Sequence, residues 1–407
     1  MQKIAIIGAG VSGMSAAHFL KDRYNVTVFE KEKTPGGLIK CCRINGSLFH
    51  TCGGHVFNSK HSDVLDWFWT KFDRNKEFSK TDRNSAIFME EGDEIPYPIE
   101  NHVYLLNSDI QKRVIKDLVE IVRKEGDKAH NFEEFLKSRF GDTLYKIYFQ
   151  PYNEKVWRRD LKQVPLSWLE GKLPMPTVEE MVYNNINHVK EKSFVHSTFW
   201  YENMNGSQYI ADKLAEELHI CYDTKNIKYA HNKWLIEEEY FDKVIFCGNI
   251  KDMVKIVEGF DIREYEDEIV KLEYHGTTAV FCEIDKNPYS WIYQPSKQHE
   301  SHRIICTGNF AKSNNGNCVP EGRITATIEF TDEISNLSRI SLHPTYLAHT
   351  YNPYTYPIQN VHTRDMIKRL KADLFPVGFY FTGRFADWEY YNMDIAMRMA
   401  MDLCKKI

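Results

Sequence analysis

The sequence predicts a mixed α/β fold in which a parallel sheet is interrupted by a mostly helical segment and by an antiparallel sheet. Three observations support this prediction. Residues 3–30 alternate as strand, glycine-rich turn, helix and strand; residues 101–150 carry apolar side chains at helical spacing; and residues 262–345 contain short β-like runs between turns rich in Gly, Asn, Pro and Ser. A chain of 407 residues is also longer than one hydrophobic core usually serves.

The N-terminal element is a strand that leads into a helix through glycines. Residues 3–7 form an apolar run, Gly8-Ala-Gly10-Val-Ser-Gly13 follows, and residues 26–30 form a second strand after a helical stretch. The glycines permit a tight turn and a close approach to a pyrophosphate, while the helix N-terminus offers N–H groups. Glu30, 17 residues after Gly13, is placed to accept hydrogen bonds from a ribose. This pattern predicts a dinucleotide-binding Rossmann domain.

The middle of the chain carries helix-start and helix-stop signals. Ser108 with Gln111 has the spacing of a capping box, and Gly126 is expected to close the helix that follows. Asn131 begins a second helix by the same kind of signal, and Gly141 is expected to end it. We expect a helical insertion here.

The later elements return to the first sheet. Residues 277–283 and 323–329 read as antiparallel strands, residues 241–249 as a buried strand, and residues 363–374 as a helix that leads into residues 378–384. The fold class is therefore α/β, with a discontinuous Rossmann domain, a helical insertion and an antiparallel sheet domain for the substrate. The expected bounds are 1–85 with 200–261 and 346–407 for the Rossmann domain, 99–199 for the insertion, and 86–98 with 262–345 for the antiparallel sheet.

Composition and charge narrow the classes of partner. The chain has 52 basic and 57 acidic residues, a net charge of −5, so no overall field attracts nucleic acid or anionic lipid. The nine cysteines are scattered without a CxxC pair, so we expect reduced thiols and no metal site. No apolar run is long enough to span a membrane and no signal peptide is evident, so we expect a cytoplasmic protein.

Two further glycine-rich segments favour FAD over NAD as the cofactor. Gly36 and Gly37 follow soon after Glu30, where flavoproteins of the amine-oxidase type bring bare backbone to the diphosphate, a segment that NAD enzymes do not need. His50 and His55 lie in the second segment; each is either a core or turn histidine or part of a flavin-facing loop. The expected cofactor contacts in this half of the chain are Gly8, Gly10, Ser12, Gly13, Glu30, Lys31, Gly36, Gly37, Leu38, His50, Gly53, Gly54 and His55.

These motifs, with three later ones, resemble the UDP-galactopyranose mutase family, within the superfamily of amine oxidases and protoporphyrinogen oxidases. Pro151-Tyr152-Asn-Glu-Lys-Val-Trp157 is similar to the mutases' Tyr-x-x-Lys-Gln-Trp, and Tyr356-Pro-Ile358 to their Tyr-Pro-Val. The segment Gly383-Arg384-Phe-Ala-Asp-Trp-Glu-Tyr390-Tyr-Asn392-Met393-Asp394 is similar to their Gly-Arg-Leu-Ala-x-Tyr-x-Tyr-x-Asp-Met-Asp. The resemblance runs in order along nearly the whole chain.

The resemblance implies roles for individual residues. Arg384 would contact the flavin or its diphosphate, and Met393 and Asp394 would begin a helix aimed at the isoalloxazine, where the positive end of the helix dipole favours an anionic reduced flavin. Gly383 and Asn392 complete the expected cofactor contacts. For the substrate, the implied contacts are Tyr152 and Trp157 at the uridine and sugar, and Tyr356 and Tyr390 at the diphosphate; a plain core role is the alternative for each of these aromatics.

The chain departs from the family pattern at several positions. His275 stands in Tyr274-His275-Gly276 where mutases have Tyr-Arg-Ser, so a histidine replaces an arginine expected on the substrate diphosphate. Lys172 stands near an expected mobile-loop arginine and would bind phosphate as a point charge. Asn392 replaces an aspartate and Gly54 a proline. These changes leave the fold prediction intact and leave the identity of the sugar open.

The function that the resemblance implies is an FAD-dependent isomerase. It would interconvert the pyranose and furanose forms of a nucleotide-linked sugar through a flavin N5–sugar adduct, for cell-surface polysaccharide or lipopolysaccharide biosynthesis. The flavin would act in its reduced form, with His55 in support and NAD(P)H as external reductant. The alternatives are an FAD-dependent oxidoreductase that acts on a sugar or amine, and a flavin-binding protein without activity. The sugar, the base and the oligomeric state, a homo-oligomer included, stay open.

Overall fold

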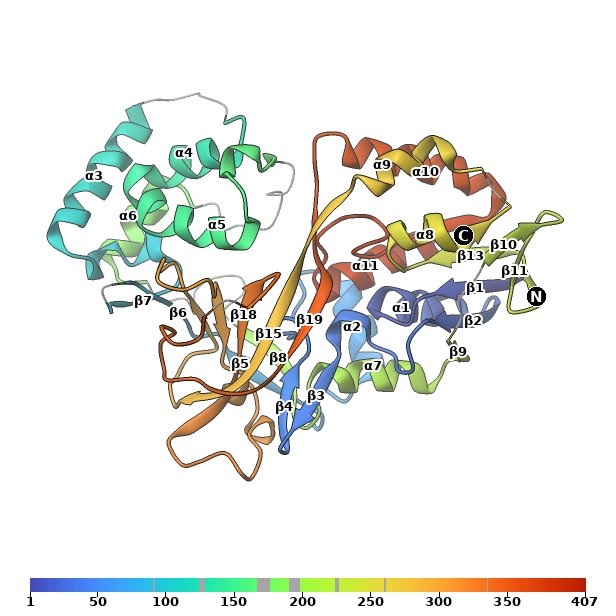
Figure 1. Cartoon of the computed structure of the whole chain (residues 1–407), viewed down its shortest axis with the longest axis horizontal. Coiled ribbons are helices and arrows are strands. Elements are labelled where there is room, and N and C mark those ends of the chain that lie inside the picture. The colour runs from blue at the N-terminus through green and yellow to red at the C-terminus, as the bar shows by residue number, and fades with distance from the viewer. Residues whose placement is uncertain are drawn as a thin grey trace.

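The computed structural model describes residues 1–90, 92–123, 129–166, 176–189, 198–223, 227–259, 261–334 and 336–407. In Figure 1 a group of helices lies at one end, the parallel sheet with its helices and both chain termini lies at the other, and two long strands, β15 (Glu273–Asp285) and β19 (Thr345–Ile358), run between them. The predicted α/β fold with a parallel sheet and a separate, largely antiparallel sheet is confirmed.

The parallel sheet contains five strands, and every neighbouring pair is parallel. Its order is β20 (Phe379–Phe381), β13 (Lys243–Phe246), β1 (Lys3–Ile7), β2 (Asn25–Glu30) and β9 (Ile220–Tyr222). Because strands from both ends of the chain alternate in it, the sheet forms only when residues far apart in sequence meet. Side chains on β1 divide between the two faces, with Ile4 and Ile6 on one and Ala5 on the other.

Helices cover both faces of this sheet. On the Ile4 and Ile6 side lie α1 (Val11–Leu20), α2 (Ser62–Lys71), α7 (Ser207–Glu216) and α11 (Met393–Cys404). On the other side lie α8 (Ile250–Ile256), α9 (Arg263–Val270) and α10 (Thr363–Leu374), with the small sheet β10 (Ile227–Ala230), β11 (Lys233–Ile236), β12 (Glu239–Phe241) and β14 (Val257–Glu258). The α1 helix is buried at nine of its ten residues, which fixes the loop before it.

The second large sheet has seven strands and is mostly antiparallel. Its order is β19, β15, β18 (Arg323–Thr331), β17 (Arg303–Ile305), β16 (Trp291–Tyr293), β6 (Ser85–Phe88) and β7 (Glu94–Pro96). One pair departs from the antiparallel pattern, because β6 comes from the first quarter of the chain and aligns parallel to β16. Two smaller pairs, β3 (Cys41–Ile44) with β4 (Ser47–His50) and β5 (Phe78–Asp82) with β8 (Thr198–Glu202), connect the sheets.

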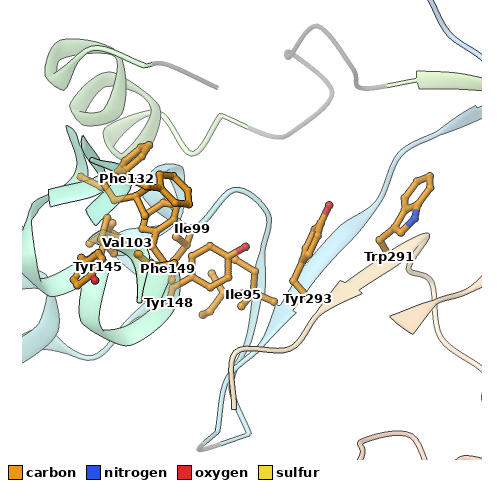
Figure 2. Packing of buried hydrophobic residues seen from close by; sticks show 14 of the residues in the cluster. Ile95, Ile99, Val103, Phe132, Tyr145, Tyr148, Phe149, Trp291 and Tyr293 are labelled. Carbon is orange, nitrogen blue, oxygen red and sulfur yellow. The ribbon is translucent and has the colours of Figure 1, made fainter. Parts of the chain in front are cut away.

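The helical segment packs around one aromatic core. It contains α3 (Ser108–Arg123), α4 (Phe132–Leu144), the π-helical turn η4 (Tyr145–Phe149), α5 (Gln150–Trp157) and α6 (Val178–Ile186). Figure 2 shows Phe132, Tyr145 and Phe149 packed together on the helices, with Tyr148 extending toward Tyr293 of the sheet. The helices are therefore joined to the sheet by aromatic side chains.

Local capping in this segment differs in part from the prediction. Asn131 accepts from the Glu134 N–H at 3.0 Å, as expected, but α3 is capped by Asn107, which accepts from the Ile110 N–H at 3.0 Å. The Gln111 amide donates instead to the Tyr104 and Leu106 carbonyls, so the capping box at Ser108 is wrong.

Gly141 bends the helical run without ending it. It adopts φ +83 inside α4, and the Asp117 carboxylate accepts from the Thr143 N–H at 2.7 Å, which restarts the helix at once. Gly126 lies outside the described residues. Among the described helices, none is long and apolar enough to cross a membrane.

Candidate functional site

The loop before α1 leaves space for a ligand at the helix N-terminus. The Gly8 N–H donates to the Phe29 carbonyl at 2.7 Å, and a Cβ at Gly13 would overlap the Gly8 carbonyl oxygen. A Cβ at Gly10, in contrast, would meet no atom within 4 Å, and no side chain caps α1 there. Gly13 therefore closes the turn, and Gly10 faces open space beside unpaired helix N–H groups.

Glu30 lies beside this loop at the end of β2. One carboxylate oxygen accepts from the Ala9 N–H at 2.6 Å and the other from the Glu32 N–H at 2.9 Å, and the residue is buried. The carboxylate is thus held by backbone at the edge of the loop. Lys31, the next residue, points outward and lies 3.3 Å from the Asp252 carboxylate.

Two other glycine segments meet the same helix end. The Gly36 N–H donates to the Ala9 carbonyl at 2.8 Å, and a Cβ at Gly37 would lie 3.4 Å from Gly10 Cα. Gly383 has φ +129, and a Cβ added to it would lie 3.2 Å from Ser12 Oγ. Leu38 packs partly buried against the neighbouring core. Three segments far apart in sequence therefore form one cradle, lined by backbone, around the N-terminus of α1.

The two histidines of the second glycine segment have different surroundings. His50 Nε2 lies 2.8 Å from the Tyr201 hydroxyl and Nδ1 3.1 Å from Ser207 Oγ, so both nitrogens are used inside the protein. His55 Nε2 is buried and has no hydrogen-bond partner among the described residues. Burial, and then the charge of Arg384, lowers the pKa of His55 to about 4, so the ring is neutral at pH 7.

Glycines also position the His55 ring. Gly53, with φ +69, has a Cβ position 3.3 Å from His55 Nε2, so a larger residue would crowd the ring. A Cβ at Gly54 would lie 2.7 Å from Ile305 Cγ2, which leaves no room for a side chain against the second sheet.

Arg384 lies over a pair of stacked tyrosines. Its guanidinium carbon is 4.0 Å from the Tyr390 ring centroid and 5.4 Å from that of Tyr356, and the two rings are 5.6 Å apart and nearly parallel. The Arg384 Nε is buried without a partner among the described residues. At the adjoining start of α11, Asn392 makes no side-chain cap, so that helix N-terminus is also open; Met393 is buried and Asp394 lies in the first turn. This end of the cradle offers cationic and N–H donors.

Arg303 is a site residue that the sequence analysis missed. It lies on β17, where its guanidinium Nε donates to a Glu329 carboxylate oxygen at 2.6 Å. Burial would lower the pKa of Arg303, but Glu329 and the neighbouring Tyr356, Tyr152 and Tyr293 raise it, so the cation persists. The only sequence signal was a charged residue inside an apolar β run, which does not reveal what the side chain faces.

The remaining predicted substrate residues divide into two groups. Tyr152 packs edge-on against Tyr293 at 5.6 Å, near Arg303. His275 is held elsewhere, with Nδ1 2.9 Å from an Asp332 oxygen and Nε2 2.8 Å from the Trp157 carbonyl. Its two ring nitrogens are therefore occupied, and Arg303 supplies the cation at the tyrosines. Trp157 is buried in the helical core, and Lys172 lies outside the described residues.

This geometry defines a dinucleotide-binding protein of the Rossmann class, with a second sheet and a helical segment beside the cradle. Residues 6–72 match the model of the NAD(P)-binding Rossmann-like domain. The chain is 27% identical over 184 residues to dTDP-fucopyranose mutase of Escherichia coli, which is 43% of this chain and 46% of that protein. It is 46% identical over 50 residues to coproporphyrinogen III oxidase of Staphylococcus aureus, 12% of this chain and 11% of that protein.

Solved structures extend the likeness to the whole chain. The crystal structure of reduced UDP-galactopyranose mutase has a TM-score of 0.86 at 22% identity, over 100% of this chain and 93% of that one. Wild-type putrescine oxidase bound to putrescine has a TM-score of 0.63 at 15% identity, over 100% and 98%. At these identities the likeness shows a shared fold, and the matched segment spans less than half of the curated mutase. The predicted resemblance to the mutase family is confirmed.

Proposed function

We propose that this chain is an FAD-dependent mutase that interconverts the pyranose and furanose forms of a nucleotide-linked sugar, for cell-surface polysaccharide or lipopolysaccharide synthesis. The observation that carries the proposal is the placement of two arginines, Arg303 and Arg384, among the tyrosines that adjoin the glycine cradle. A pair of half-buried cations in an aromatic setting suits a diphosphate that links two uncharged groups. The likeness to the two mutases supports the same reading.

The residues of the cradle fit a flavin dinucleotide. Gly10, Gly37 and Gly383 would let backbone approach the diphosphate, and Glu30 would accept from the adenosine ribose. The buried Nε atoms of His55 and Arg384 lack partners among the described residues, as expected for groups that a cofactor completes. When bound and reduced, the flavin supplies a nucleophilic nitrogen for the anomeric carbon.

The chain itself would bind and orient the nucleotide sugar. Arg303 and Arg384 would neutralise the diphosphate and stabilise the negative charge that it gains as it leaves the anomeric carbon. Tyr356 and Tyr390 would donate hydrogen bonds to the same oxygens, each worth about 1.5–3 kcal/mol because the acceptor is charged. Tyr152, together with the aromatic rings that pack against it, would exclude water from the sugar.

The test uses the holoprotein reduced with dithionite. UDP-galactopyranose and dTDP-fucopyranose are supplied in large excess, and the products are separated by chromatography and assigned by NMR. We expect many turnovers to a furanose per reduction, no turnover by the oxidised protein, and NAD(P)H able to replace dithionite. A colourless protein that binds NAD instead of FAD contradicts the cofactor assignment.

The second candidate is an FAD-dependent oxidoreductase acting on a sugar or amine. The match over 50 residues to coproporphyrinogen III oxidase and the shared fold with putrescine oxidase favour it. It predicts that substrate reduces the flavin stoichiometrically, with no furanose product, and the same assay, started from the oxidised holoprotein and followed by flavin absorbance, distinguishes the two.

A further inference from the structure

Strand β18 carries a row of buried polar side chains on one face of the second sheet. Side chains along a strand alternate between its two faces, and the apolar residues of β18 form a core on the opposite side. The polar residues, each at most 2% exposed, are Thr325, Thr327, Glu329 and Thr331. Buried polar groups need hydrogen-bond partners, so the surroundings of this row matter.

A segment of the cofactor cradle crosses the row at Thr327. Thr327 lies between Phe281 on β15 and Ile305 on β17, which are its cross-strand partners. The Phe49 ring stacks on Phe281, with the ring centroids 4.9 Å apart, and a Cβ at Gly54 would lie 2.7 Å from Ile305 Cγ2. The chain from Phe49 to Gly54 therefore passes over this face of the sheet at Thr327.

Helix α5 meets the same row two positions beyond Glu329. The Thr331 hydroxyl donates to the Val156 carbonyl of α5 at 3.3 Å. Glu329 is two residues from Thr327 and two from Thr331, on the same face as both. The Glu329 side chain therefore lies between the cofactor cradle and the helix that carries Tyr152.

Only one oxygen of the Glu329 carboxylate has a partner in the described part of the chain. Oε2 accepts from Arg303 Nε at 2.6 Å, also contacts Arg303 Nη2, and lies 3.8 Å from His302 Nε2. Oε1 is buried, and no described residue donates to it. An ionised carboxylate can only accept hydrogen bonds, so the missing partner is a hydroxyl or N–H group and not a phosphate.

We propose that Glu329 Oε1 accepts a hydrogen bond from a hydroxyl group of the sugar in the nucleotide sugar. The proposal rests on the proposed function, which assigns Arg303, bound to the other carboxylate oxygen, to the diphosphate. The sugar is joined directly to that diphosphate, so its hydroxyls are the donors nearest to Glu329. A sugar without the matching hydroxyl leaves a buried charge unpaired, and Glu329 thereby selects the sugar.

The experiment measures dissociation constants for the oxidised FAD holoprotein by titration calorimetry. The ligands are UDP-galactopyranose and dTDP-fucopyranose, each beside analogues in which fluorine replaces a single sugar hydroxyl. Fluorine cannot donate a hydrogen bond, and the replacement leaves the charge of the ligand unchanged. We expect at least one replacement to weaken binding to the wild-type protein about tenfold or more.

Glu329→Gln should remove most of this preference for hydroxyl over fluorine at one position of the sugar. Arg303 holds the amide oxygen of the new side chain, and the NH2 group that replaces Oε1 cannot accept from a hydroxyl. If Glu329 only supported Arg303, the substitution would weaken the parent ligand and its analogues equally. Asp285→Asn is the matched control, because Asp285 accepts from Arg323 at 2.6 Å in another arginine–carboxylate pair of the sheet, and it should leave every constant unchanged.

Three outcomes overturn the proposal. The first, which needs no variant, is that no fluorine replacement weakens binding to the wild-type protein. The second is that Glu329→Gln keeps the wild-type preference at every position, and the third is that Asp285→Asn loses the preference as well. Furanose formation combined with any of these overturns this inference alone, whereas failure of both nucleotide sugars to bind overturns the proposed function too.

Discussion

The free energy of unfolding depends on pH through the Glu100 carboxyl group. Burial raises its pKa in the folded state to about 7 from the usual 4.5, so protonation favours the folded protein. This contribution is complete below pH 4.5 and is lost as the pH rises through 7, at a cost of about 3 kcal/mol. Tyr148, its titratable neighbour, stays neutral throughout this range because its own pKa is raised.

We therefore expect Glu100→Gln to unfold at the same urea concentration as the wild type at pH 5 and at a clearly higher one at pH 8. Urea titrations at both pH values, followed by circular dichroism, measure the difference. A constant gap between the two proteins across this pH range would show that the Glu100 carboxyl does not titrate in the folded state as its burial requires.

A variant of Arg303 tests the geometry of its guanidinium group separately from its charge. Arg303→Lys keeps a cation beside Glu329 but loses the planar fork that binds two oxygens at once. We expect kcat/KM for a nucleotide sugar to fall about tenfold or more, in line with about 1.5–3 kcal/mol for a hydrogen bond to a charged group, with unchanged flavin content. Arg323→Lys, which alters a more distant arginine on β18, should leave kcat/KM unchanged; an equal loss there would indicate a general effect on the sheet.

At the scale of elements, two glycines in the turn before α1 have different roles, one in folding and one in cofactor binding. A Cβ at Gly13 would overlap the Gly8 carbonyl oxygen, so Gly13→Ala should lower both the melting temperature and the FAD content. A Cβ at Gly10 meets open space, so Gly10→Ala should keep the melting temperature of the apoprotein and weaken FAD binding about tenfold. Thermal melts beside flavin absorbance test both. Wild-type FAD affinity in Gly10→Ala would mean that the cofactor does not approach Gly10.

Helix α5 ends at Trp157, which is buried at 3% exposure in the helical core. Trp157→Ala should therefore cost about 3–5 kcal/mol of unfolding free energy, and loosen His275, whose ring contacts the Trp157 carbonyl. Chemical denaturation measures the loss. A stable variant with a raised KM would instead assign Trp157 to substrate contact.

Elements defined by local signals could be predicted from the sequence, and those defined by distant contacts could not. The strand at residues 3–7, the cap at Asn131 and the helix at 363–374 depend on neighbouring residues, and the structure contains all three. The parallel pairing of β6 with β16 joins segments some two hundred residues apart, which no local pattern encodes. For the same reason Arg303 was missed, because its role depends on tyrosines from three other parts of the chain.

For the whole molecule, the parallel sheet and its helices depend on the last residues of the chain. Helix α11 packs against α1, where Met397 and Ala400 share a core with Met14 and Ala17. Removal of residues 393–407 should expose this apolar surface and leave a colourless, aggregating protein. Gel filtration and flavin absorbance of the truncated chain test this; a yellow monomer would show that the cradle forms without α11.

The order of the elements along the chain, with β1 and α1 far ahead of β13, β20 and α11, has a consequence for synthesis. Both elements are synthesised long before the elements that pack beside them, because β13 begins at residue 243, β20 at 379 and α11 at 393. At about 5–20 residues per second, α1 waits roughly 20–75 s for its permanent neighbour. Gly383 and Arg384 emerge equally late, so the glycine cradle is incomplete until they have been synthesised. Until then the apolar surface of α1 needs a chaperone or a transient contact within the growing chain.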